Sequence, residues 1–246
     1  MFGILDRYYV GRKKGVIGED IDWSARINDS GTSNDSWYCF VPKLVMKNGF
    51  VWRGLVPHEG RVVVYTTSYI NLIVPNAVKT RDNLRVIYDD AIKKMQQDSS
   101  RGRKINVLGV SIGNVLSVRL ANEVSGSRIN RLVSIVGGGF LGRSAWDSIA
   151  TRDVAQNSGC DSVEEYEEIL AEFGPAYYLP NIFAEKVFAR FGGNDLMIRY
   201  NPHGMELRNS LEKMEAHSRD IKTYKRFDHS STILRTSWEK LHERVK

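Results

Sequence analysis

The sequence predicts an α/β fold built on a mostly parallel central sheet with helices on both faces. The first reason is a rhythm: short apolar, β-branched runs alternate with segments of helical periodicity along the 246 residues. The second is that several runs are apolar throughout, which is the pattern of strands buried on both faces. The third is that glycine-containing turns close three runs, at residues 109–113, 137–139 and 192–193. A chain of this length can bury one large core.

The composition is that of an ordinary globular protein, with 42% hydrophobic and 26% charged residues. The formal net charge is +6, but basic and acidic residues are interspersed. The densest basic groups, Arg12–Lys14 and Arg101–Lys104, are short. We therefore expect a solvated surface and no nucleic-acid interface. The sequence has no internal repeat.

The sequence also bears on the cellular compartment. Met1–Leu5 are followed at once by Asp6 and Arg7, so the apolar core of a signal peptide is missing. No run approaches the length of a membrane span. Cys39 and Cys160 lie far apart and have no metal-ligand spacing. One disulfide stays open, but free thiols in a reducing compartment are the simpler interpretation, and we expect a cytoplasmic protein.

The first hundred residues predict an edge region and the beginning of the sheet. Residues 1–28 mix aromatic, β-branched and charged side chains around glycines, which favours one or two peripheral strands. The polar residues 28–36 predict a loop. Residues 79–97 predict a helix, because the apolar positions from Leu84 to Met95 keep the i, i+3, i+4, i+7 spacing of one buried stripe. The remaining expected elements are strands at Trp37–Val41 and Arg61–Thr67 and a short helix at Phe50–Pro57.

Residues 104–124 contain the motif that organises the rest of the chain. The apolar run Lys104–Val110 meets Gly109-Val110-Ser111-Ile112-Gly113, and a helical pattern follows directly. This context predicts a strand, a tight turn and a helix, with Ser111 lifted above the end of the sheet at strained backbone angles. Small residues are needed two positions either side of the serine, because strand and helix pass too close there for side chains. The motif is that of a nucleophile elbow.

The second half of the chain predicts a helical insertion between two strands. Residues 140–183 carry two or three short helical patterns, and their aromatic side chains favour a small core of their own over a substrate clamp. We expect residues 1–139 and 184–246 to form the core domain and residues 140–183 to form a cap or lid. The other expected elements are strands at Arg131–Val136, Lys186–Phe191 and, nearer the edge, Asp220–Phe227, helices at Met205–Ala216 and Thr232–Val245, and a loop at Asp228–Ser231.

Three residues supply a nucleophile, a base and an acid at predicted strand ends. A serine hydroxyl needs a neighbouring base, and the base needs an acid that orients its imidazole. Ser111, Asp195 and His229 each follow a predicted parallel strand, where open α/β sheets place their sites. Their order along the chain, Ser, Asp, His, is the one found with this elbow.

From about Trp37 to its C-terminus, the chain resembles the α/β-hydrolase superfamily, and in particular its serine esterases and lipases. Phe191–Asp195 and the following Asn201–Gly204 resemble the glycine-rich acid loop of that family and the segment after it. Phe227–Ser230 resembles its histidine loop, and Phe50–Val64 resembles its first helix and the strand that follows. The resemblance implies the α/β-hydrolase fold and a catalytic triad of the three residues named above.

The resemblance also implies an oxyanion hole made of two backbone N–H groups. One belongs to Ile112, the residue after the nucleophile. The family takes the other from a His-Gly segment after the first of these strands, where this chain reads Pro42-Lys43-Leu44. The matching donor is Leu44, with Lys43 as the alternative. Here the chain departs from the family pattern, because the small residue is missing.

Other residues are candidates for the same roles. Asp147 or Asp153 could supply the acid instead of Asp195, whereas Asp228 is better interpreted as a loop cap. Asn114 and Asp228 stand where glycine is common in the family. The remaining histidines are expected on the surface or in helices: His58, His203, His217 and His242.

The expected function is hydrolysis of a carboxylic ester or thioester of a small or medium acyl group through an acyl-enzyme. No metal or organic cofactor is implied, and the expected partner is a small-molecule substrate; the oligomeric state is not predicted. Acyl transfer or C–C hydrolysis by the same triad is one alternative. A non-catalytic binding protein with the same fold is the other, suggested by the departure at Lys43.

Overall fold

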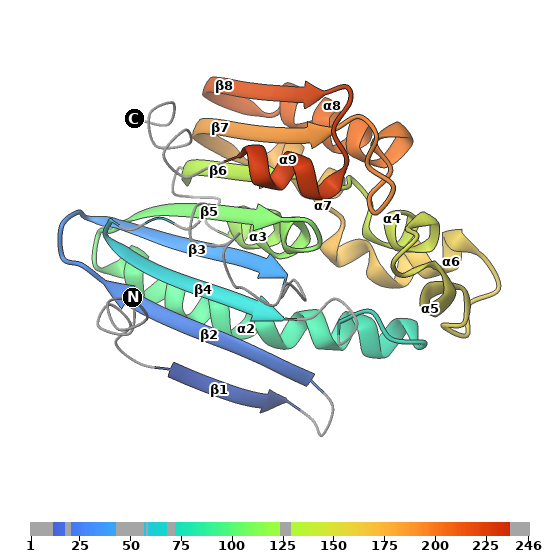
Figure 1. The fold of residues 1–246 in the computed structure, drawn as a ribbon. Helices are drawn as coiled ribbons and strands as arrows, with labels where there is room; N and C mark the ends of the chain where they lie inside the picture. Colours follow the sequence, from blue (N-terminus) through green and yellow to red (C-terminus); the bar gives the residue numbers. More distant parts are fainter. Residues whose placement is uncertain are drawn as a thin grey trace, which may run out of the picture.

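The computed structural model describes residues 12–17, 21–42, 57, 59–67, 72–123 and 129–236. Within these residues the strands form one eight-stranded sheet in the order β1-β2-β4-β3-β5-β6-β7-β8 (Figure 1). Neighbouring strands from β4 to β8 are parallel, whereas β2 runs antiparallel to both β1 and β4. The strands are β1 Arg12–Ile17, β2 Ile21–Asp29, β3 Asp35–Pro42, β4 Arg61–Thr67, β5 Lys104–Val110, β6 Ile129–Ile135, β7 Phe183–Gly192 and β8 Glu215–Tyr224.

Helices connect the parallel strands and cover the sheet, as predicted. The long helix α2 and the elbow helix α3 lie on one side of the sheet, and α9 lies on the other (Figure 1). The helices of the core are α2 Ala77–Ser100, α3 Gly113–Glu123, η5 Tyr200–Gly204, α8 Met205–Lys213 and α9 His229–Arg235. Between β6 and β7 come α4 Leu141–Asp147, α5 Arg152–Gln156, α6 Val163–Leu170, η3 Ala171–Phe173, α7 Pro175–Tyr178 and η4 Leu179–Asn181.

The hydrophobic core has two parts, one on each face of the sheet. Alternate residues of β3 show the division: Tyr38 and Phe40 pack with side chains of α2 and α3, whereas Trp37 and Cys39 belong to the cluster that includes Ile233 of α9. Successive side chains of a strand point to opposite faces, so one strand serves both parts. The strand pattern read from the sequence therefore corresponds to burial on both faces.

The helices between β6 and β7 pack on one another and on the core. Trp146 of α4 contacts Tyr166 of α6 with ring centroids 5.7 Å apart. Phe173 is buried and packs edge-on against Tyr88 of α2. The guanidinium of Arg119 in α3 lies 4.9 Å from the ring centroid of Tyr178. These aromatic side chains thus form a small core among the helices between β6 and β7, as the sequence suggested. They also contact α2 and α3, the helices that cover the sheet.

Several predicted bounds differ from the observed ones near the C-terminus. The last strand lies at the sheet edge, as expected, but covers Glu215–Tyr224 instead of 220–227. Half of its residues are exposed, so the pattern of apolar residues gives little information about where this strand begins and ends. The predicted loop 228–231 is the first turn of α9, and Asp228 is its N-cap. The last helix was expected at Thr232–Val245, but α9 ends at Arg235, with Thr236 as its C-cap in extended conformation. Residues 237–245 lie outside the described residues, as does the predicted helix at 50–57 except for Pro57.

Two further features bear on the expectations about compartment. Among the described residues, no helix combines the length and the apolar character that a membrane span requires. Cys39 and Cys160 are both free thiols, and burial raises the pKa of the Cys39 thiol above its ordinary value.

Candidate active site

Ser111 occupies the turn between β5 and α3 with the strained backbone that the motif predicts. Its φ is 55°, in the left-handed region that L-residues with side chains rarely adopt. The flanking glycines are required by close packing. A Cβ at Gly113 would collide with the carbonyl oxygen of Phe40, and one at Gly109 would collide with Ser117 and with the backbone of Asn114. The strand–turn–helix geometry of the elbow is therefore present.

The buried Asn114 ties this turn to the neighbouring strand. Its Nδ2 donates hydrogen bonds to the carbonyl oxygens of Ser111 and Ile135, each at 3.0 Å. Its Oδ1 accepts from the hydroxyl of Ser134 at 2.5 Å. The backbone N–H of Ser111 also donates to Ile135, at 2.9 Å. The departure from glycine at position 114 thus gives a side chain that fixes the elbow. The sequence carried no signal for these bonds.

Asp195 and His229 form a buried pair. Nδ1 of His229 lies 2.7 Å from Oδ2 of Asp195, and the two residues are only 5% and 4% exposed. The other carboxylate oxygen accepts hydrogen bonds from the backbone N–H groups of Met197 and Ile198, both at 2.9 Å. A carboxylate can only accept, so Nδ1 carries the proton and Nε2 is the free ring nitrogen.

A capping box sets the position of His229. The Asp228 side chain accepts from the backbone N–H of Ser231 at 2.7 Å, and the Ser231 hydroxyl accepts from the N–H of Asp228 at 3.0 Å. The hydroxyl and N–H of Ser231 hold the pKa of Asp228 below its ordinary value. His229 is the first residue of the helix that this box begins.

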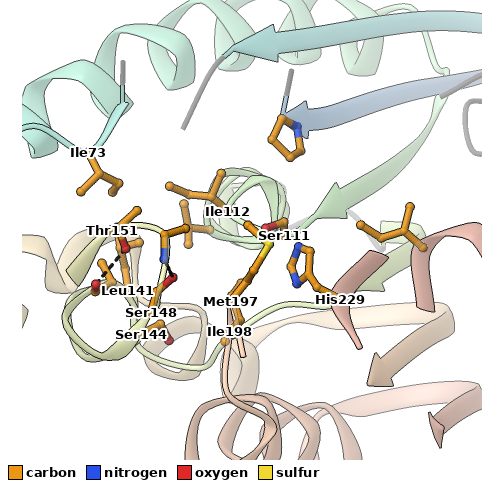
Figure 2. A pocket seen from close by; sticks show the side chains of 16 residues that line it. Ile73, Ser111, Ile112, Leu141, Ser144, Ser148, Thr151, Met197, Ile198 and His229 are labelled. Carbon is orange, nitrogen blue, oxygen red and sulfur yellow. Dashed lines mark hydrogen bonds between the residues drawn. The ribbon is translucent and has the colours of Figure 1, made fainter. Parts of the chain in front are cut away.

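Ser111 and His229 line one pocket, which holds about 770 Å³ of empty space, part of it open to solvent (Figure 2). Ile112 and Pro42, the last residue of β3, also line it. Leu44 and Lys43, the expected second oxyanion donor and its alternative, lie outside the described residues. The wall opposite β3 comes from α4, the segment between α4 and α5, and the segment after Asp195, and much of it is apolar: Leu141, Ala145, Ala150, Met197 and Ile198.

Of the other acids weighed for the site, neither contacts His229. Asp153 is exposed, with 94% of its side-chain surface accessible. Oδ2 of Asp147 lies 2.9 Å from Nε2 of His203. Within the part of the chain that the structure describes, no group of three or more His, Cys, Asp or Glu side chains is arranged to hold a metal ion.

His203 lies in a helix, one of the two kinds of position expected for it, but it is not at the surface. The residue lies in η5 and is 2% exposed, enclosed between Asp147 of α4 and Glu206 of α8. Its Nδ1 lies 3.7 Å from Oε2 of Glu206. His217 is exposed on β8, as expected, whereas His58 and His242 lie outside the described residues. The partner of His203 is 56 residues away, so local sequence could not identify it.

No protein-family model and no curated protein matches the sequence. Solved structures do match. An esterase from Pyrococcus furiosus has a TM-score of 0.61 at 14% identity, covering 97% of this chain and 91% of the other. An acetyl xylan esterase from a Paenibacillus species has a TM-score of 0.62 at 10% identity, covering 98% and 89%. The acylaminoacyl peptidase of Pyrococcus horikoshii has a TM-score of 0.57 at 14% identity, covering 99% and 41%.

The chain thus has the α/β-hydrolase fold, in agreement with the resemblance read from its motifs. It spans about two fifths of the length of the acylaminoacyl peptidases and about nine tenths of the two esterases. At these identities the likeness is one of fold, and function has to be argued from the site itself.

Proposed function

We propose that the protein is a serine hydrolase that cleaves a carboxylic ester or thioester through an acyl-enzyme intermediate. The observation that supports this most is the buried contact between Nδ1 of His229 and Oδ2 of Asp195, in a site where His229 and the strained Ser111 line the same pocket. Histidine oriented by a carboxylate is the arrangement that activates a serine hydroxyl.

In the proposed reaction Oγ of Ser111 attacks the substrate carbonyl while Nε2 of His229 takes its proton. The tetrahedral oxyanion is stabilised by the backbone N–H of Ile112 and by a second donor, for which we propose Leu44. The protonated His229 then gives its proton to the departing alcohol or thiol, leaving the acyl group on Ser111. Water, deprotonated by His229, hydrolyses the acyl-enzyme.

Asp195 acts in this scheme as the residue that orients His229. Its two backbone hydrogen bonds from Met197 and Ile198 hold the carboxylate in place, so it can support positive charge on the imidazole without moving. The fixed carboxylate also keeps His229 in the tautomer that leaves Nε2 free to accept a proton.

An esterase is favoured over a peptidase by the extent of the structural match. The two esterases are matched over nearly their whole length, whereas the acylaminoacyl peptidases are more than twice as long as this chain. We further propose that residues 140–183 act as a cap, because α4 and the segment that follows it supply one wall of the pocket that contains Ser111. The free thiols of Cys39 and Cys160 favour the cytoplasm.

Hydrolysis of p-nitrophenyl acetate tests the proposal. We expect turnover by the wild type and a loss of about 10⁴-fold or more in Ser111→Ala, the range seen when a serine nucleophile is removed. The matched control is Ser218→Ala, an exposed position on the edge strand β8, which should retain full activity. Equal activity in Ser111→Ala and wild type would contradict the proposal.

A further inference from the structure

The pocket extends mainly to one side of Ser111. In Figure 2 His229 lies on one side of the serine, and Ile73, Leu141 and Thr151 lie on the other. The two sides therefore offer different surroundings to the two parts of an ester.

The reaction chemistry determines which part of the ester lies on which side of Ser111. His229 gives its proton to the leaving group, so the leaving alcohol or thiol must lie within hydrogen-bond reach of Nε2. The acyl group, attached to the same carbonyl carbon, then points away from His229. It enters the part of the pocket bounded by Ile73, Leu141 and Thr151, which we call the acyl chamber.

The acyl chamber is lined by hydrocarbon. Ile73, Ile112, Leu141 and Ala145 contribute aliphatic side chains, and apart from His229 none of the described residues that line the pocket is charged or aromatic. An apolar lining of this kind stabilises a ligand by removing hydrocarbon from water, whereas a bound sugar or ion would leave its polar groups without partners.

Of the three hydroxyl groups in this wall, two take part in hydrogen bonds within it and the third is buried. Oγ of Ser148 accepts from the backbone N–H of Ala150 at 3.1 Å, and Oγ1 of Thr151 donates to the carbonyl of Ala145 at 2.8 Å (Figure 2). The buried hydroxyl of Ser144 has no hydrogen-bond partner among the described residues, but it packs against Gly138, where an added Cβ would collide with it. Most of the surface that the pocket presents to a ligand is therefore hydrocarbon.

Two exposed apolar residues are chain neighbours of the pocket lining. Ile149 and Leu196 are each 59% exposed. Ile149 lies between the lining residues Ser148 and Ala150, and Leu196 directly precedes the lining residue Met197. Their backbones are close to each other, because the N–H of Ile149 donates to the carbonyl of Leu196 at 3.5 Å.

We propose that the acyl chamber binds an unbranched or lightly branched hydrocarbon acyl group longer than acetyl, and that Ala145 and Ala150 leave the room it occupies. This inference rests on the proposed function. An acetyl group carries a single methyl group, which cannot contact all of the aliphatic side chains that line the chamber. The side chains at positions 145 and 150 are the smallest on the wall. A larger side chain at either position should therefore leave room only for a shorter acyl group.

Two ester series test which part of the substrate enters the chamber. In the first, p-nitrophenol is constant and the acyl group is acetyl, butyryl or hexanoyl, below the critical micelle concentration. Since each buried methylene favours binding about three- to fourfold, we expect kcat/KM to rise at least tenfold from acetyl to hexanoyl. In the second, acetyl is constant and the alcohol lengthens from ethyl to hexyl, where we expect less than a threefold change. A flat first series or a steeper second series would overturn the proposal.

Variants locate the chamber. Ala145→Leu should lower the ratio of kcat/KM for hexanoyl to that for acetyl at least tenfold. Ala176→Leu, a half-buried alanine of α7 outside the lining, should leave this ratio within twofold of wild type. If circular dichroism shows that Ala145→Leu is unfolded, the more accessible Ala150→Leu carries the same expectation. An unchanged ratio in the folded variant would overturn the proposal.

The failures of the two proposals are distinguishable. If the acetyl ester is hydrolysed in a Ser111-dependent way but longer acyl groups bring no gain, the serine hydrolase stands and the acyl chamber fails. If no ester in either series is hydrolysed by the folded wild type, the proposed function itself fails.

Discussion

Oδ2 of Asp195 lies 2.7 Å from Nδ1 of His229, and Oδ1 of the same carboxylate accepts two backbone hydrogen bonds from its own loop. The loop after β7 thus fixes the carboxylate, and the carboxylate fixes the imidazole at the start of α9. A rigid acid and a histidine with one defined tautomer are what a general base requires.

Replacing this acid should reduce activity without unfolding the protein. In Asp195→Asn the amide can present N–H to the ring, which favours the tautomer with the proton on Nε2. That nitrogen can then no longer accept the proton of Ser111. We expect kcat/KM for p-nitrophenyl acetate to fall about 10³- to 10⁴-fold.

The matched control for this variant is Asp153→Asn, the exposed acid that the sequence left open as an alternative. It should retain the activity of the wild type. Full activity in Asp195→Asn, or a large loss in Asp153→Asn, would exclude Asp195 as the acid of the site.

Asn114 should contribute strongly to stability. Asn114→Ala removes three hydrogen bonds; the carbonyls of Ser111 and Ile135 each keep a backbone donor, whereas the buried hydroxyl of Ser134 loses its acceptor. Because each intramolecular hydrogen bond contributes about 1 kcal/mol and a buried hydroxyl without a partner costs more, we expect the free energy of unfolding in urea to fall by about 2–4 kcal/mol. The exposed Asn157→Ala should cost about 0.5 kcal/mol or less. Similar losses in both would contradict this role.

His203 and Asp147 should be energetically coupled. Their contact joins α4 to the segment after the acid loop, and His203 is buried whereas Asp147 is partly exposed. A double-mutant cycle with His203→Ala and Asp147→Ala should give an interaction energy of about 1 kcal/mol at pH 7, since solvent screens part of it. The same cycle with the exposed His217→Ala in place of His203→Ala should give an interaction near zero.

The cap of α9 should depend on pH. The pKa of Asp228 is lowered in the folded protein, so its charge stabilises the fold fully above the ordinary carboxyl pKa of 3.8, and this contribution is lost as the pH falls through the folded value. Asp228→Ala should cost about 1 kcal/mol at pH 7. The difference from wild type, measured by urea unfolding, should narrow at pH 2.

Asp228→Asn provides the control, because asparagine caps a helix without a titratable charge. Its stability relative to Asp228→Ala should be the same at both pH values. A difference between wild type and Asp228→Ala that does not change with pH would show that the charge of Asp228 has no part in the cap.

The elbow could be predicted because its determinants are local. The positions of Gly109 and Gly113 follow from the close approach of strand and helix, and the positive φ of Ser111 belongs to the same turn. The parallel strands could also be predicted from the sequence, because strands buried on both faces of a sheet form unbroken apolar runs.

Features that depend on partners far away in the sequence could not be predicted from it. The burial of His203 arises from α4 and α8, and the hydrogen bonds of Asn114 reach a strand 20 residues away. The reversed direction of β2 is set by pairing with β4, which no pattern within β2 specifies. The first turn of α9 was mistaken for a loop because Asp, Ser and His favour turns as well as caps.

Labelling with a fluorophosphonate shows directly whether Ser111 is a nucleophile. We expect one label per folded chain, located on Ser111 by peptide mass spectrometry, with none in Ser111→Ala and full labelling in Ser218→Ala. A folded wild type that takes up no label, or a label that persists in Ser111→Ala, would contradict this expectation.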